Sequence, residues 1–169
     1  DGNIPGVKTK AVLAYLPEDD HLYAWMTVAE IGAFVRRFFA DWQQDRFDHL
    51  LDFLSLERNI KIGTLSKGMR ARVKLLLTMS RNADLLLLDE PFSGIDIKSR
   101  ERIINALLEF NRDQEQGIIL STHEIHECEA IFDQIVCIEK GKMKIKGNAD
   151  QLRLEFGKSI IDIYREVYV

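Results

Sequence analysis

The sequence predicts an α/β fold in which helices flank a mostly parallel sheet. Strand-like and helix-like segments alternate after Ser66, which is typical of such a sheet. Residues 85–88 are four consecutive leucines, as expected of a central strand in a parallel sheet. The chain of 169 residues is long enough for one domain with a sizeable core.

Composition excludes several classes of protein. The net charge of −4 gives no support for nucleic-acid binding. No apolar run is long enough to span a membrane, and the polar first residues do not form a signal peptide. The two cysteines, Cys128 and Cys137, indicate a reduced protein rather than a disulfide scaffold.

The first part of the chain predicts one strand and a pair of helices. Residues 11–16 form a buried strand that ends at Pro17, and residues 17–26 form a loop. Thr27 and Glu30 have the spacing of a capping box, which predicts that a helix begins there. Its apolar face contains Ile31, Phe34, Val35, Phe38 and Phe39.

A second helix is predicted near residues 45–55. Its apolar side contains Phe47, Leu50, Leu51 and Leu54. The two helices together form a candidate subdomain, and residues 56–65 form the loop that leaves it.

The remaining elements follow in alternation. Ser66 can cap a helix over 67–80, and Asp96 can cap a long helix that ends near Asn111. After these we expect a strand at 118–121 and a helix after His123. Two strands at 134–139 and 143–146 should follow around a Lys140-Gly141 turn. The tail from Asp150 should be helical, with a break near Gly157.

Two carboxylates come directly after the leucine strand. Asp89 and Glu90 therefore lie at the carboxyl edge of the sheet, where α/β proteins bind their ligands. The two side chains should point to opposite sides of the strand. One can hold Mg²⁺ and the other can accept a proton from an attacking water. Taken alone, the pair is equally compatible with a strand that ends in a polar turn.

A phosphate site is suggested where the helix at 67–80 begins. Ser66 offers a hydroxyl, Gly68 allows close approach to the backbone, and free N–H groups attract anions. An ordinary capped helix would have the same pattern. His123 follows the strand at 118–121 and could contact a phosphate, although a lone histidine in this place is commonly a loop residue.

The order of these motifs is more specific than any one of them. Together they resemble the ABC ATPase family over nearly the whole chain, from about Val12 onward. The motifs correspond in family order to the signature, the Walker B strand, the D-loop and the switch histidine: Leu65-Ser66-Lys67-Gly68-Met69, Leu-Leu-Leu-Leu-Asp89-Glu90-Pro91, Ser93-Gly94-Ile95-Asp96 and Ser121-Thr122-His123.

The resemblance implies a P-loop NTPase-type fold and a role for each matching residue. The cofactors it implies are ATP and Mg²⁺, with Asp89 supporting the metal and Glu90 acting as the general base. His123 is the switch histidine. In a dimer, a second ABC ATPase domain would hold an ATP molecule at the interface. This ATP would contact Ser66, Lys67, Gly68 and Asp96 of the present chain.

Three positions depart from the common family pattern. Lys67 stands where many members have Gly, and Met69 where many have Gln or Glu. Glu18 stands where many have a Gln that contacts Mg²⁺, so Glu18 is a candidate metal ligand.

The family's phosphate-binding loop, Gly-x-x-x-x-Gly-Lys-Ser/Thr, does not occur in this sequence. Gly157-Lys158-Ser159 is not that loop, because Leu152 replaces the first Gly and a predicted helix precedes the triplet. We therefore expect a truncated ATPase domain that lacks the N-terminal strands and is inactive alone.

The resemblance also divides the chain and implies partners. It assigns residues 11–26 to a strand and Q-loop region, 27–65 to a helical subdomain that docks on a transmembrane permease, 66–147 to the catalytic core and 148–169 to a C-terminal tail. The protein would form a homodimer or heterodimer, bind no nucleic acid, and lie in the cytoplasm on the inner face of the cell membrane through the permease. The tail and the stretch Trp25-Met26-Thr27-Val28 resemble bacterial antibiotic- and peptide-efflux ATPases.

Other functions stay open on the sequence. A metal site could use His123, His126 and Cys128, although their spacing differs from that of zinc proteases. An ABC ATPase that acts on ribosomes or DNA is a second alternative. The third is an inert interaction fragment.

Overall fold

The structure is a computed structural model that describes residues 6–111 and 116–168. It has the predicted α/β fold, with a parallel sheet and flanking helices. Contacts within the chain divide it into two units, of which the first ends at Thr122 and the second begins at His123.

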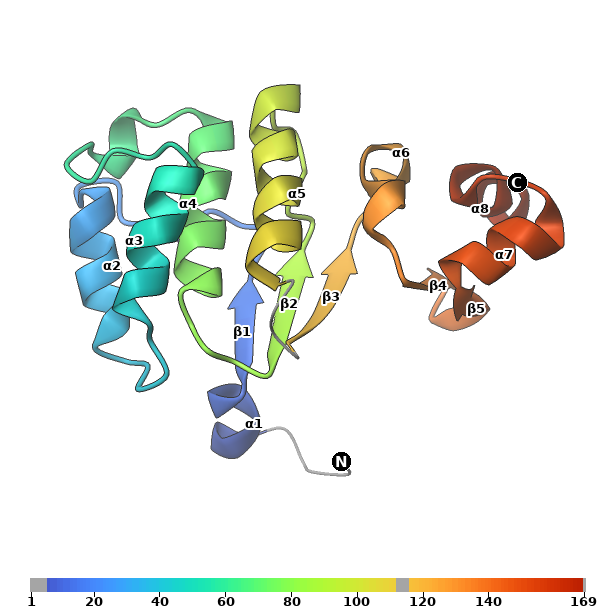
Figure 1. The fold of residues 1–169 in the computed structure, drawn as a ribbon, viewed down its shortest axis with the longest axis horizontal. Helices are drawn as coiled ribbons and strands as arrows, with labels where there is room; N and C mark the ends of the chain where they lie inside the picture. Colours follow the sequence, from blue (N-terminus) through green and yellow to red (C-terminus); the bar gives the residue numbers. More distant parts are fainter. Residues whose placement is uncertain (1–5, 112–115, 169) are drawn as a thin grey trace. The chain divides into compact units, whose positions relative to one another are not determined.

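The sheet of the first unit has three parallel strands in the order β1-β2-β3 (Figure 1). They are β1 (Leu13–Leu16), β2 (Leu85–Asp89) and β3 (Gly117–Ser121). The leucine strand is central, as predicted, with Leu16 opposite Leu88 on one side and Leu120 opposite Leu88 on the other.

One face of the sheet is buried under helices. The helices of this unit are α1 (Val7–Ala11), α2 (Val28–Arg36), α3 (Gln44–Phe53), α4 (Lys67–Met79), α5 (Ile97–Asn111) and a short 3₁₀ helix at Ile62–Thr64. The helix α4 packs against β1, α3 and α5. The alternate strand residues Ala14, Leu16, Leu86 and Leu88 are buried, because successive side chains of a strand point to opposite faces of the sheet.

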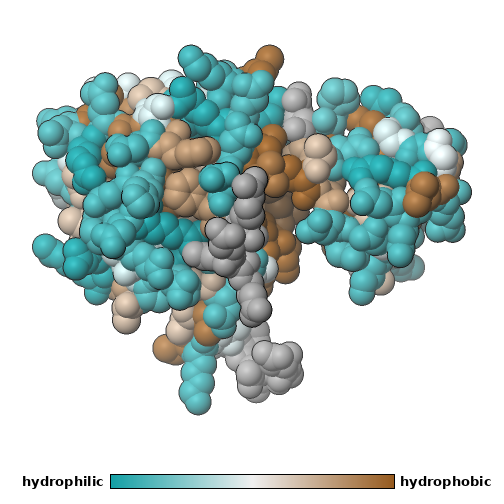
Figure 2. Space-filling view, viewed as in Figure 1, coloured by the Kyte–Doolittle hydropathy of each residue, from teal (hydrophilic) through white to brown (hydrophobic). Residues whose placement is uncertain are grey.

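The opposite face of the sheet carries exposed apolar side chains. Tyr15 is 49% exposed and Ile119 is 55% exposed. Figure 2 shows hydrophobic surface near β3.

Local capping places the helices where the sequence predicts them. The Thr27 hydroxyl accepts from the Glu30 amide at 3.2 Å and the Glu30 carboxylate accepts from the Thr27 amide at 2.8 Å, which completes the capping box. The four apolar residues predicted for the second helix, Phe47, Leu50, Leu51 and Leu54, are all buried.

Two predicted boundaries were wrong. The first strand begins at Leu13 rather than residue 11, because the helix α1 extends to Ala11 and Val12 is its C-cap. The helix after Thr27 ends at Arg36. The amides of Arg37 and Phe38, which follow it, donate to carbonyls three residues back instead of four. Phe38 and Phe39 therefore lie outside that helix: Phe38 packs on Phe34, and the Phe39 ring lies under the guanidinium of Arg81.

The second unit combines a hairpin with short helices. Its elements are α6 (Ile125–Cys128), a 3₁₀ helix at Glu129–Ile131, the antiparallel strands β4 (Gln134–Glu139) and β5 (Lys142–Asn148), α7 (Ala149–Phe156) and α8 (Ile160–Tyr168). The predicted turn joins the strands with positive φ at Lys140 and Gly141. Gly157 ends α7 with φ of 63°, so the predicted break is confirmed.

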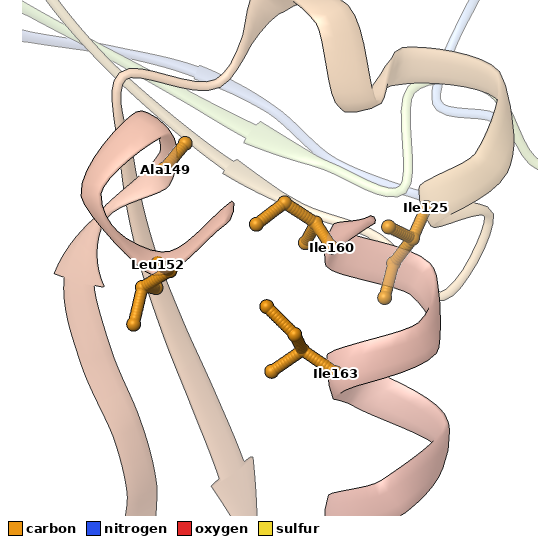
Figure 3. Close-up of a cluster of buried hydrophobic side chains, with 5 residues drawn as sticks. All are labelled: Ile125, Ala149, Leu152, Ile160 and Ile163. Carbon is orange, nitrogen blue, oxygen red and sulfur yellow. The ribbon is translucent and has the colours of Figure 1, made fainter. Parts of the chain in front are cut away.

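The core of the second unit lies between α6, α7 and α8 (Figure 3). Ile160 and Ile163 extend from α8 toward Ala149 and Leu152 of α7 and Ile125 of α6. Across residues 6–111 and 116–168, no helix has both the length and the apolar composition required to cross a bilayer.

Candidate functional site

The candidate site begins at the carboxyl edge of the three-stranded sheet. Asp89 is the last residue of β2 and lies opposite Ser121, the last residue of β3. Both are carried to the same edge because parallel strands end there together. Tyr15 of β1 contributes from the other neighbouring strand.

Hydrogen bonds orient the Asp89 carboxylate. The Tyr15 hydroxyl donates to Asp89 Oδ2 at 3.1 Å, and the Ser121 hydroxyl donates to Oδ1 at 2.6 Å. Partial desolvation, together with the hydrogen bond to Asp89 and its charge, raises the pKa of Tyr15, so its phenol remains a donor. Each carboxylate oxygen still has a lone pair available, as direct or water-mediated Mg²⁺ binding requires.

Glu90 turns the chain away from the sheet. Its φ of 45° is unusual for a residue with a side chain. The Glu90 amide donates to the Ser121 carbonyl at 3.0 Å, and its distance to the Ser121 hydroxyl is 3.3 Å. Strained backbone of this kind persists only where surrounding contacts fix it, and it is concentrated at functional sites. Here the fixing contacts come from the end of β3.

The second group of predicted residues lies where α4 begins. Ser66 caps α4, since its hydroxyl accepts from the Met69 amide at 3.2 Å. Ser66 and Lys67 are exposed, whereas Gly68 is buried. A Cβ at Gly68 would lie 2.5 Å from Asp96 Oδ2 and would also collide with the Ser99 hydroxyl. Gly68 therefore allows α4 and α5 to approach, a packing role that the sequence did not reveal.

Asp96 begins α5 as predicted. Its carboxylate accepts from the Ser99 amide at 2.9 Å and from the Ser99 hydroxyl at 2.8 Å. The hydrogen bonds from the Ser99 side chain and backbone hold the pKa of Asp96 below its ordinary value. Lys67 reaches the same loop: its ammonium lies beside Gly94, where φ is +61°. The signature and D-loop residues are thus in contact.

Glu18, the candidate metal ligand, lies on an exposed loop after β1. Lys74 of α4 donates to the carbonyls of Pro17 and Glu18, both at 2.8 Å. Arg70 of α4 forms an ion pair with Asp20 at 2.7 Å. The helix that carries the signature therefore also holds the loop that carries Glu18.

The structure thus brings most of the predicted residues into two clusters of the first unit. Asp89 and Glu90 form one cluster with Tyr15 and Ser121, and Ser66, Lys67, Gly68 and Asp96 form the other. His123 begins the second unit, and its role stays a prediction. In the described part of the chain no three His, Cys, Asp or Glu side chains are grouped so as to hold a metal, and the alternative site at His123, His126 and Cys128 gains no support.

Tyr15, Arg70 and Lys74 are the contacts that sequence reasoning missed. Tyr15 could have been found, because it alternates with buried Ala14 and Leu16 and so faces the other side of the sheet. Lys74 gave no such signal, because its acceptors are main-chain carbonyls 56 and 57 residues away.

Known proteins resemble this chain in sequence and in structure. A family model described as ABC transporter matches residues 5–93. The uncharacterized ABC transporter ATP-binding protein YxlF of Bacillus subtilis is 28% identical over 149 residues, which cover 85% of this chain and 50% of that protein. The ABC-type organic anion transporter ABCA8B of Mus musculus is 30% identical over 95% of this chain but only 10% of its own length.

A solved structure described as the ATP-binding subunit of an ABC transporter superposes with a TM-score of 0.81. It is 26% identical, and the match covers 96% of this chain and 70% of that one. The chain thus spans half of its bacterial relative and a small part of the mammalian one. With a family model over more than half of its residues and this structural likeness, the chain belongs to the ABC transporter family, among its ATP-binding subunits.

Proposed function

We propose that the intact protein hydrolyses ATP to drive an ABC transporter, and that Asp89 and Glu90 are its catalytic carboxylates. The observation that carries the proposal is the edge of the sheet, where Tyr15 and Ser121 orient Asp89 and the end of β3 fixes Glu90 in an uncommon conformation. An ordinary polar turn does not need hydroxyl donors on both oxygens of its carboxylate, as Asp89 has.

In the proposed reaction Glu90 accepts a proton from a water molecule. The water oxygen forms a bond to the γ-phosphorus of ATP, and the bond to the β–γ bridging oxygen breaks, which releases ADP and phosphate. Asp89, with Glu18 as a second residue, would hold Mg²⁺, which would supply charge stabilisation to the phosphates. His123 would contact the γ-phosphate.

The second cluster supports a site shared between two ATPase domains. Ser66, Lys67 and Asp96 are exposed, as residues that meet an ATP held by another subunit must be. Ser66 and Lys67 also lie at the N-terminus of α4, whose dipole favours an anion. The proposed assembly is therefore a homodimer or a heterodimer, with Gly68 keeping α4 close to Asp96.

The proposed membrane partner is a transmembrane permease that holds the protein at the cytoplasmic face. An exposed aromatic cluster, formed by the loop before Thr27 and by the predicted helical subdomain, supports this proposal: Tyr23, Trp25 and Phe38 are 46%, 68% and 66% exposed and pack with one another or with Phe34. A cytoplasmic segment of the permease would cover the cluster. Efflux as the direction of transport rests on the resemblance of the Trp25–Val28 stretch and of the tail.

The decisive variant is Glu90→Gln in the full-length protein. We expect ATP turnover to fall by at least about 100-fold, since an amide cannot accept the proton of water. Binding of a non-hydrolysable ATP analogue, measured by calorimetry, should be unchanged. The 169-residue chain, which has no Gly-x-x-x-x-Gly-Lys-Ser/Thr motif, should bind this analogue weakly or not at all.

The matched control is Glu57→Gln, which makes the same chemical change at an exposed position. It should retain wild-type turnover. Undiminished turnover in Glu90→Gln would refute the assignment of the general base.

A further inference from the structure

A pair of cations on α4 binds the loop between β1 and the helical subdomain. Lys74 lies two turns after the start of α4 and is partly buried. Both of its described hydrogen bonds go to the carbonyls of Pro17 and Glu18, at 2.8 Å each. A charged donor that bonds two successive carbonyls fixes the position of the backbone between them.

Arg70, one turn before Lys74, holds the next part of the same loop. Its guanidinium donates to Asp20 Oδ2 at 2.7 Å and to the carbonyls of Leu65 and Gly63, both at 3.3 Å. Asp20 in turn accepts from the Leu22 amide at 3.1 Å. Partial burial alone would raise the pKa of Asp20. The hydrogen bonds from Arg70 and Leu22 and the positive charges of Arg70 and Lys74 have the larger, opposite effect, so the pKa of Asp20 lies below its ordinary value.

Charge and geometry therefore agree on a loop clamp, which we define as Lys74 and Arg70 with their acceptors Pro17, Glu18 and Asp20. The sequence Glu18-Asp19-Asp20 concentrates three carboxylates, and the clamp opposes them with two cations. Both cations project from the helix whose first residue follows Ser66. A displacement of α4 must therefore move the loop with it, because the bonds run to the loop backbone.

We propose that Lys74, supported by Arg70, is a positioning residue that sets the place of Glu18 and thereby couples the start of α4 to Mg²⁺ binding. The proposal rests on the proposed function, since it assigns Glu18 to the metal. Lys74 itself would touch neither ATP nor Mg²⁺, because its two described bonds are to main-chain oxygens.

The first test measures the loop without ATP. In the ¹⁵N-labelled chain, Lys74→Met should lower the backbone order parameters of residues 18–20 from about 0.85 to below about 0.6. Lys74→Arg, which retains the charge and several donors, should keep them close to wild type. Lys142→Met, an exposed lysine of the second unit, is the control for loss of a charge. Order parameters that stay unchanged in Lys74→Met would overturn the loop clamp.

The second test measures ATP hydrolysis by the full-length protein against Mg²⁺ concentration. Lys74→Met should raise the Mg²⁺ concentration for half-maximal turnover by about tenfold, with a smaller effect on turnover at saturating Mg²⁺. A milder variant, Asp20→Asn, removes the charge paired with Arg70 and should shift the same midpoint by a smaller factor. Equal midpoints in wild type and Lys74→Met would overturn the coupling to Mg²⁺.

The two tests separate this proposal from the proposed function. A wild-type protein that hydrolyses no ATP would contradict the proposed function, and the order parameters would still decide whether Lys74 holds the loop. A uniform fall in turnover, with no change in the Mg²⁺ midpoint, would indicate a purely structural role and reject the positioning role.

Discussion

Gly68 shows how one residue can join packing and function. The sequence suggested that its small size lets a phosphate approach the backbone. In the structure Gly68 is buried, and the space that a Cβ would need is taken by Asp96 and Ser99. The absence of a side chain at position 68 is therefore required by the contact of α4 with α5, whether or not a phosphate binds.

The variant Gly68→Ala tests this packing role. Overpacking should cost about 1–3 kcal/mol in the free energy of unfolding. That cost exceeds the gain of at most about 1 kcal/mol from the higher helix propensity of Ala. Urea denaturation would measure the difference, with Lys67→Ala at the neighbouring exposed position as the control. A Gly68→Ala protein as stable as wild type would show that α5 can shift freely.

At the scale of elements, Arg81 joins the end of α4 to the start of β1. Its side chain is 6% exposed and pairs with Asp41 at 3.0 Å. It also donates to the carbonyls of Leu13 at 2.7 Å and Ala11 at 2.9 Å, and its guanidinium lies 3.9 Å from the centre of the Phe39 ring. Arg81 thus holds three segments that are far apart in the sequence.

Replacing Arg81 with Met should therefore lower stability strongly. The substitution leaves Asp41 and two carbonyls without their donor, and breaking a buried pair in this way costs about 3–5 kcal/mol. Arg58→Met is the matched control, because Arg58 pairs with Asp48 at 2.7 Å but both side chains are well exposed, at 48% and 38%. Its cost should be at most about 1 kcal/mol. Thermal unfolding of both variants would check the contrast, and equal losses would contradict the role of burial.

At the scale of the whole molecule, the chain has two units with separate cores. The second, His123–Val169, is small, and small units are only marginally stable. Its core is formed by residues such as Ile163, which is 3% exposed. Glu129 adds a polar link, since its carboxylate accepts from the Ile160 amide at 2.9 Å and from Arg153 at 3.3 Å.

Damage to this core should remain within the second unit. Ile163→Ala removes buried methyl and methylene groups, which costs about 2–5 kcal/mol at a site of this kind. Hydrogen exchange should accelerate at the amides of β4, β5, α7 and α8, with little change in β2 and α4. Leu154→Ala, at a position 84% exposed, is the control. Equal acceleration in both units would show that they unfold as one.

The sequence by itself determined the elements whose causes are local. The caps at Thr27, Ser66 and Asp96, the four-leucine strand before Asp89 and the turn at Lys140 depend on residues a few positions apart, and each was confirmed. The fold class followed from their order. The motifs also identified the family, although the roles of the site residues stay proposals.

Only the tertiary structure decided which distant groups meet. The partners of Asp89, the clamp on Glu18 and the buried contacts of Arg81 join residues between 32 and 74 positions apart. Such pairs have no fixed spacing in sequence, because they are set by how strands and helices stack. The same holds for Phe39, which lies beyond the end of α2 and whose ring lies under the guanidinium of Arg81, 42 residues further along the chain.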